Sequence, residues 1–229
     1  MENNTFALEG NREMLSKERT ELLLVDLKNE STKWEKIKLS GKSFNIESAE
    51  YLSQILPALV NVTSVDISDI IAGKSKEEAN RVLQIICDAL KDNSKIVEVD
   101  ISDNALGEKG IESCSNLLSK TETIESLTLN NDGLSPAAAK LLKGVLLRGN
   151  KNIALKKLHF FNNLLKDGGA KEISEIINSC PNLTDFRFSS TRSGIDGILS
   201  LTNSLISCNQ LVALDLSDNS ADSGEGNKK

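Results

Sequence analysis

The sequence predicts an α/β solenoid in which short parallel strands form one layer and helices form the layer behind it. Three observations predict this fold. An apolar-x-apolar core recurs along the chain at intervals of 28, 34, 28, 31, 28 and 28 residues. A polar residue follows most cores after three positions, and a helical pattern of apolar residues comes next. The cores are Ile37/Leu39, Val65/Ile67, Val99/Ile101, Leu127/Leu129, Leu158/Phe160, Phe186/Phe188 and Leu214/Leu216.

A period of 28 residues lies at the long end of the leucine-rich repeat range, where each unit has room for a strand and a full helix. Strand, helix and parallel strand connect with a right-handed crossover. We therefore expect a right-handed leucine-rich repeat solenoid, a ribonuclease-inhibitor-like horseshoe arc with parallel strands inside and helices outside. The two long units carry extra residues around 72–77 and at 148–151.

The pattern divides the chain into three parts. Residues 1–33 hold a charged, amphipathic segment and are expected to cap the amino-terminal end. Residues 34–219 form the repeat domain, with about six repeats and a final strand, and residues 220–229 are a polar tail expected to be disordered. Because no helix can follow the last strand, the array is expected to stop within a repeat, as in a truncated form.

Composition excludes several classes of function. The net charge of −6 argues against a nucleic-acid binder, which needs a basic face. No apolar stretch is long enough to insert in a membrane, and the first residues resemble no signal peptide. Cysteines without paired spacing predict buried free thiols and no metal site. The single histidine, His159, lies on the expected concave side of a strand and has no nucleophile in its own turn, so we interpret it as a surface contact.

The polar side chain three residues after each core is expected to point inward and to bond backbone groups that would otherwise be buried unpaired. We call this the ladder position. Ile70 occupies it in the second repeat, so that turn must be built differently. The remaining ladder residues are Asn104, Asp132, Asn163, Thr191 and Asn219.

The residue before each ladder position is expected to face solvent where strand ends become turns. We call this edge the rim. Its residues are acidic or carry small polar groups, which suits a basic protein partner better than a nucleic acid, although a solvated polar turn explains any one of them equally well. The rim residues are Asp69, Asp103, Asn131, Asn162, Ser190 and Asp218.

Four segments of the turns resemble successive repeats of the Ran GTPase-activating protein family, most closely its plant-type branch. They are Asp66 to Lys74, Ser102 to Gly107, Leu127 to Gly133 and Phe186 to Arg192, within a match that covers roughly residues 35–218. The resemblance implies a protein that binds the small GTPase Ran in its GTP form and stimulates GTP hydrolysis without being an enzyme itself.

The family is understood to act without an arginine finger. A rim asparagine matching Asn131 holds the catalytic glutamine of the GTPase, which orients the attacking water. Lys74 stands where the family has an arginine important for activity, and it lacks the planar fork of that side chain. The resemblance assigns Asn131 and Lys74 to activation. We assign GTPase contact to Asp69, Asp103, Asn162, Ser190 and Arg192.

The resemblance also implies partners and location. GTP and Mg²⁺ would belong to the GTPase, so the chain is expected to hold no cofactor of its own, and a Ran-binding accessory protein is a further possible partner. A cytoplasmic address in nucleocytoplasmic transport is expected, with a place near the nuclear envelope left open. Two alternatives remain: a binding scaffold of the ribonuclease-inhibitor type, and an inactive truncated form.

Overall fold

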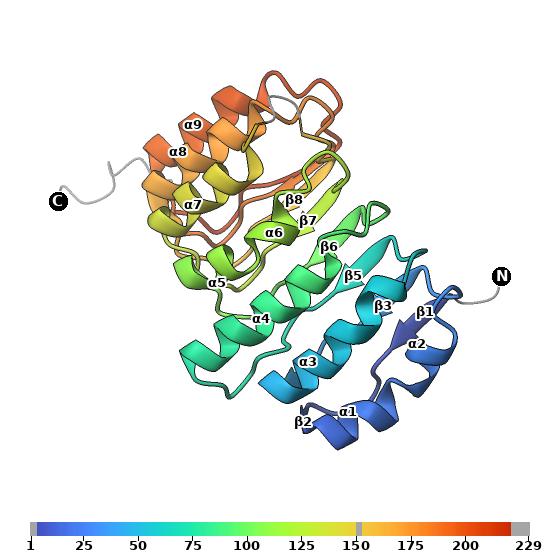
Figure 1. Ribbon diagram of the computed structural model, residues 1–229. Helices are drawn as coiled ribbons and strands as arrows, with labels where there is room; N and C mark the ends of the chain where they lie inside the picture. The colour runs from blue at the N-terminus through green and yellow to red at the C-terminus, as the bar shows by residue number, and fades with distance from the viewer. Residues whose placement is uncertain (1–3, 150–152, 221–229) are drawn as a thin grey trace.

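The structure, a computed structural model, describes residues 4–149 and 153–220. Eight short strands form one parallel sheet in the order β1-β3-β5-β6-β7-β8-β9-β10, and β2 pairs with β4 beside it. Figure 1 shows the helices stacked along one side of this sheet. The predicted leucine-rich repeat fold is confirmed. The strands are β1 (Thr5–Ala7), β2 (Glu13–Leu15), β3 (Lys36–Lys38), β4 (Lys42–Phe44), β5 (Ser64–Asp66), β6 (Glu98–Asp100), β7 (Ser126–Thr128), β8 (Lys157–His159), β9 (Asp185–Arg187) and β10 (Ala213–Asp215).

The central apolar residue of each strand from β3 to β9 is buried against the helices, while its two neighbours in the strand face the concave side. Parallel pairing aligns these central residues, so Ile37, Val65 and Val99 lie side by side across three strands. The helices behind them are α1 (Lys17–Leu23), α2 (Val25–Asn29), α3 (Ile46–Ile55), the 3-10 helix η1 (Leu56–Ala58), α4 (Lys76–Leu90), α5 (Gly107–Ser113), α6 (Ser115–Leu118), α7 (Pro136–Leu146), α8 (Lys166–Ile177) and α9 (Ile195–Leu205).

Two helices begin at serine caps of the type that sequence rules favour. The Ser75 hydroxyl accepts a hydrogen bond from the Glu78 N–H at 3.2 Å, and Ser135 accepts from the Ala138 N–H at 3.1 Å. Pro136 follows Ser135 at the first helical position, where its missing N–H costs nothing. These caps fix where the chain leaves each turn.

Residues 4–33 do more than supply a capping helix. Strand β1 extends the main sheet beside β3, and Phe6 packs edge-on against Trp34 with ring centroids 5.5 Å apart. The amino-terminal segment is therefore built into the array as a strand followed by helices. The division into domains stays a prediction, and the predicted disordered tail falls, apart from Ser220, on residues 221–229, which lie outside the described ranges.

The four cysteines are free and buried, as the sequence predicts. Burial raises the pKa of the Cys180 thiol to about 12, so this side chain is a protonated apolar filler at neutral pH.

The last repeat covers one apolar face of α9 and leaves other apolar side chains exposed. Leu201 and Leu205 are buried because this face of α9 packs against α8. The uncovered apolar side chains belong to the other side of α9, to Val212 just before β10, which is 88% exposed, and to Leu214 in β10, which is 51% exposed. Strand β10 forms one edge of the main sheet.

We predict that this edge associates at high protein concentration, because a strand edge flanked by exposed Val212 and Leu214 invites pairing with another chain. Val212→Lys should reduce the association, since a lysine at an edge opposes pairing, while leaving the fold intact. Sedimentation velocity over a range of concentrations measures this. A monomeric chain at every concentration, with amide exchange as slow in β10 as in β8, would contradict it.

Candidate functional site

The ladder side chains behave as the sequence predicts. The Asn104 carbonyl oxygen accepts the Ile70 N–H at 3.0 Å, while its NH₂ group donates to the carbonyls of Ile67 at 2.9 Å and of Ile101 at 2.8 Å. Asn163 and Asn219 repeat this arrangement. Each amide therefore closes the turn of the preceding repeat as well as its own. The turn at Ile70 needs no polar side chain because Asn104 bonds its backbone.

Two ladder residues depart from this arrangement. Thr191 donates its hydroxyl to Asn219 Oδ1 at 2.8 Å, and Asp132 lacks one hydrogen-bond partner. The Oδ1 of Asp132 accepts the Asn104 N–H at 2.9 Å, but its Oδ2 has no hydrogen-bond partner among the described residues, although the side chain is fully buried. Burial raises the pKa of Asp132 well above its usual range, against the opposing effect of the hydrogen bond from Asn104. A protonated carboxyl would resemble the amides of the neighbouring repeats.

The six rim residues all have left-handed backbone conformations, with φ between 51° and 62°. Asparagine and aspartate tolerate this region best, which accounts for the residue types found there. Their backbones are tied to the next turn: the N–H of Asn131 donates to the Phe161 carbonyl at 2.8 Å, and that of Asp103 to the Asn130 carbonyl at 2.9 Å. Asp103, Asn131, Asn162 and Asp218 are exposed, while Asp69 and Ser190 are half-buried. The rim is thus a rigid, solvent-facing edge.

Side-chain hydrogen bonds join the middle of the rim. The Asn131 NH₂ group donates to Asp103 Oδ1 at 2.7 Å, and the Asn162 NH₂ group donates to Asn131 Oδ1 at 2.9 Å. A second pair lies further along, where the Ser190 hydroxyl donates to Asp218 Oδ2 at 2.7 Å. Asn131 therefore stands between an acceptor and a donor, at the centre of a connected row.

The other predicted site residues lie at different places. Arg192 is exposed just beyond the fifth rim position, with a φ of 59°. Lys74 belongs to the second-repeat insertion, but its side chain is only 7% exposed and forms an ion pair with Glu78 at 3.3 Å. Although Lys74 belongs to an insertion, its side chain is therefore buried. A groove of about 460 Å³ joins Lys74 to the rim, with Asp103 and Ala105 in its wall.

Sequence reasoning missed two contacts of the site. Arg12 in the amino-terminal segment forms an ion pair with the rim residue Asp69, with its Nε 3.1 Å from Asp69 Oδ2. Nothing in the local sequence signals a contact between residues so far apart in the chain. The contact of Lys74 with Glu78 joins the residue before the Ser75 cap to the first turn of α4, and the spacing of four residues is a signal that could have found it.

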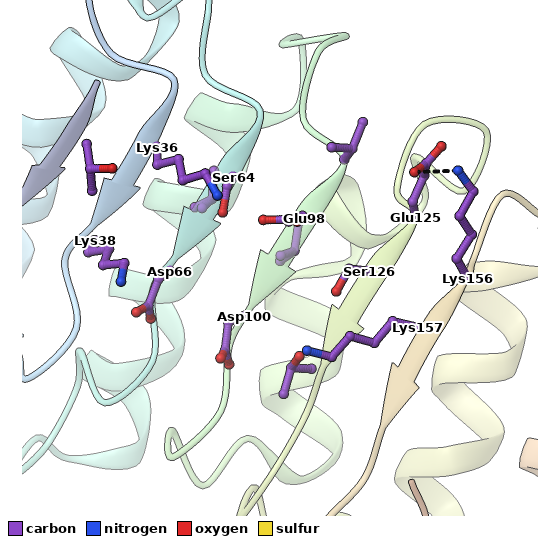
Figure 2. Close-up of a pocket in the computed structure, with 15 residues that line it drawn as sticks. Lys36, Lys38, Ser64, Asp66, Glu98, Asp100, Glu125, Ser126, Lys156 and Lys157 are labelled. Atoms are coloured by element: carbon purple, nitrogen blue, oxygen red, sulfur yellow. Dashed lines mark ion pairs between the residues drawn. The ribbon is translucent and has the colours of Figure 1, made fainter. Parts of the chain in front are cut away.

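The concave face beside the rim is charged and hollowed. Figure 2 shows Lys36 and Lys38 on β3, then acidic side chains on β5 and β6, then Lys157 on β8, around a hollow of about 730 Å³. Asp66 and Asp100 are register partners at the carboxyl ends of their strands. Both brace turns, since their Oδ1 atoms accept the N–H groups of Ser68 and Ser102 at 3.0 Å. Acidic groups thus line the rim and the sheet at the second and third repeats.

His159 lies on the concave face and pairs with Asp185, with Nε2 2.8 Å from Oδ1. Burial lowers the pKa of His159, and the contact with Asp185 opposes this shift. In the described parts of the chain, no three or more His, Cys, Asp and Glu side chains gather in a group able to hold a metal ion. None of the described helices combines the length and apolar character required to cross a bilayer.

The chain is similar to Ran GTPase-activating proteins. It is 38% identical over 121 residues to RAN GTPase-activating protein 1 of Arabidopsis thaliana, an alignment that covers 52% of this chain and 22% of that protein. It is 28% identical over 149 residues to Ran GTPase-activating protein 1 of Xenopus laevis, covering 61% of this chain and 26% of that one. The chain spans about a fifth to a quarter of the length of these relatives. No protein-family model matches it.

One solved structure is similar in fold alone. The actin-binding site 2 portion of leiomodin-1 has a TM-score of 0.51 and 15% sequence identity, and the superposition covers 71% of this chain and 88% of that one. At this identity the likeness extends to the repeat architecture and not to the residues of the rim.

We predict that Asp132→Asn stabilises the protein at neutral pH, since an amide can donate to the carbonyls of the turn where the carboxylate Oδ2 has no partner. An unsatisfied buried group costs about 1–3 kcal/mol. The folded-state pKa of Asp132 is raised, so its stabilising contribution is complete below the unfolded pKa of about 3.9 and is lost as pH rises through the folded pKa.

Urea unfolding of both proteins between pH 4 and pH 8 measures this difference. The free energy of unfolding of the unmodified protein should fall relative to that of Asp132→Asn as pH increases. Parallel curves, or a less stable asparagine variant at pH 7, would show that the carboxylate is already satisfied.

Proposed function

Since the chain is a relative of the Ran GTPase-activating proteins, we propose that it is a GTPase-activating protein for Ran and stimulates GTP hydrolysis by positioning the catalytic glutamine of the GTPase. The relationship supports a role in GTPase activation with Ran as partner. These relatives are several times longer than this chain, and we propose their activity for the residues that the chain contains.

The position of Asn131 carries the proposal. Its amide is exposed at the centre of the rim, on a backbone held by a hydrogen bond to the next turn. One N–H and one carbonyl lone pair of this amide are not engaged by the bonds to Asp103 and Asn162. An amide with one donor and one acceptor can hold a second amide in a single orientation, which is what positioning a glutamine requires.

The charge of the surrounding surface supports a basic protein partner. Asp103, Asp66 and Asp100 lie together at the second and third repeats, on the rim and on the adjacent ends of the strands, and Asp69 beside them is paired with Arg12. Acidic groups at this edge favour encounter with a basic surface and orient it on the rim. We propose that Asp69, Asp103, Asn162, Ser190 and Arg192 contact the GTPase.

The proposal assigns the chemistry to the partner. The GTPase supplies GTP, Mg²⁺ and the water-orienting glutamine, and this chain supplies no catalytic group that bonds to the substrate and holds no cofactor of its own. We further propose a place in nucleocytoplasmic transport, a cytoplasmic location that extends to the nuclear envelope, and cooperation with a Ran-binding accessory protein.

A second candidate is a binding scaffold that uses the concave face. The hollow of about 730 Å³ with its alternating charges favours it, because this surface could bind a protein without any role for the rim. Single-turnover hydrolysis of GTP loaded on Ran and on two unrelated small GTPases separates the candidates. Acceleration with Ran alone supports activation, and binding without acceleration supports the scaffold. The absence of both binding and acceleration would indicate an inactive form.

We predict that Asn131→Ala lowers the saturating hydrolysis rate by on the order of a hundredfold, as expected for the loss of one positioned donor worth about 2.7 kcal/mol. Binding to the GTPase should largely survive, because one exposed amide is a small part of an interface. The stability should stay within about 0.5 kcal/mol, since the side chain is exposed. Stopped-flow hydrolysis and thermal unfolding measure the two effects.

Asp132→Ala is the matched control, because Asp132 follows Asn131 in the chain and points inward. It leaves the buried Asn104 N–H without its acceptor, at a cost of about 1–3 kcal/mol in stability. Its hydrolysis rate should fall only as far as folded protein is lost. Equal losses of activity in both variants, in step with their melting temperatures, would identify the turn as purely structural.

We predict that Lys74→Arg raises the hydrolysis rate, because a guanidinium can hold two acceptors where an ammonium acts as a point charge. To reach a partner, the side chain must leave Glu78. Glu78→Gln, which removes that negative charge, should therefore also raise the rate with lysine at position 74. An unchanged or lower rate for Lys74→Arg, at equal content of folded protein, would remove Lys74 from the site.

A further inference from the structure

We propose that Asp103 and Asn162 are positioning residues for Asn131, and that the direction of their hydrogen-bond chain decides which atom of the Asn131 amide faces the GTPase. This inference rests on the proposed function and deepens it. The role of these two neighbours of Asn131 depends on which of their side-chain atoms donate and which accept, and not on charge alone.

The backbones of the three residues are fixed before their side chains meet. Each has a left-handed conformation, with φ of 62° at Asp103, 55° at Asn131 and 53° at Asn162. Each donates its backbone N–H to a carbonyl of the following turn, at 2.9, 2.8 and 3.0 Å. The three side chains therefore leave rigid turns from successive repeats of a parallel stack, and they reach one another in the order Asp103, Asn131, Asn162.

Chemistry forces the direction of the chain. An ionised carboxylate has acceptors and no donor. Asp103 therefore requires the NH₂ group of Asn131, as found at 2.7 Å, and this turns the Asn131 carbonyl oxygen toward Asn162. Asn162 must then present its own NH₂ group, as found at 2.9 Å. The carboxylate at one end thus orients two amides in sequence.

The orientation determines what Asn131 offers to a partner. Its free N–H lies on the side of the third repeat and its free lone pair on the side of the fifth. A partner amide would meet this pair in one order only, since the reversed order would set donor against donor and acceptor against acceptor. An unbraced amide could rotate between both orders, and catalysis loses rate steeply when a positioned group is misplaced.

Exchange of the two end residues tests the direction. The double variant Asp103→Asn with Asn162→Asp keeps the composition, the net charge and the number of possible hydrogen bonds. Asp at position 162 accepts from the Asn131 NH₂ group, so the Asn131 amide should rotate and accept from Asn at position 103. We expect an unchanged melting temperature and a saturating single-turnover rate reduced by about tenfold or more.

The single variant Asp103→Asn is the matched control. An asparagine at this position can accept from Asn131 or donate to it, so both directions of the hydrogen-bond chain become possible and the Asn131 amide is no longer held in one order. We expect a saturating rate between those of the unmodified protein and of the exchanged variant, because Asn131 is correctly oriented for only part of the time, together with a lower affinity for the GTPase from the loss of an acidic group. Adding Asn131→Ala to the exchanged variant should cause little further loss, because the oriented amide is already lost.

A measurement on the free protein separates this inference from the proposed function. The side-chain NH₂ resonances of Asn131 and Asn162, identified by their absence in the alanine variants, report the acceptor of each amide in a ¹⁵N-labelled sample. The exchanged variant should shift both resonances of Asn131. If the unmodified protein does not accelerate GTP hydrolysis by Ran, the proposed function is wrong, and the hydrogen-bond chain then has no role in activation.

Three results would overturn the inference while leaving the proposed function intact. The exchanged variant could stimulate GTP hydrolysis as strongly as the unmodified protein, which would show that the direction of the hydrogen bonds does not matter. Its stimulated rate could fall only in proportion to the loss of folded protein, which would show that the hydrogen-bond chain is purely structural. Unshifted Asn131 amide resonances in that variant would show that the end residues do not orient this amide.

Discussion

Three consecutive turns at the middle of the array depend on a polar side chain supplied by the next repeat. Asn104 closes the turn that contains Ile70, Asp132 closes that of Asn104, and Asn163 closes that of Asp132. A solenoid of this kind has buried backbone donors at each turn, and leaving one unpaired costs about as much as a lost hydrogen bond. This dependence on the neighbour orders the strands, sets the spacing of the turns, and forces the preceding residue outward.

The same dependence explains how structure and proposed activity are divided between adjacent residues. Asn131 and Asp132 share one turn, but one is exposed and the other is fully buried. The exposed amide is then free to serve a partner because the inner residue already satisfies the backbone. Asp132 does so imperfectly, with one unpartnered oxygen, whereas Asn104 and Asn163 do so completely among the described residues.

Periodic features of the fold could be predicted because each repeat reports the same physical requirement. The structure confirms the strand cores from Ile37/Leu39 to Phe186/Phe188 and the inward direction of the ladder position, whereas Leu214 in the last predicted core is 51% exposed. Contacts that join distant segments could not be predicted. Arg12 reaches Asp69 across 57 positions, and no pattern within either segment indicates that they meet.

The candidate site was predictable in position but not in geometry. That Asn131 faces solvent follows from the inward direction of Asp132. That Asn131 is hydrogen-bonded on both sides depends on the exact placement of three turns, which the sequence does not state. The burial of Lys74 has a different cause: the residue belongs to an insertion, but the ion pair with Glu78 on the first turn of α4 holds its ammonium against the protein.

The packing of Phe6 against Trp34 has a consequence for how unfolding of this chain would be observed. Trp34 is the single tryptophan of the sequence and lies beside β3, close to one end of the array. Because repeats contact only their neighbours, loosening can begin at either end and need not spread at once to the other. Intrinsic fluorescence therefore reports the amino-terminal end alone, while far-ultraviolet circular dichroism averages over all repeats, and a difference between the two transitions would indicate at which end unfolding starts.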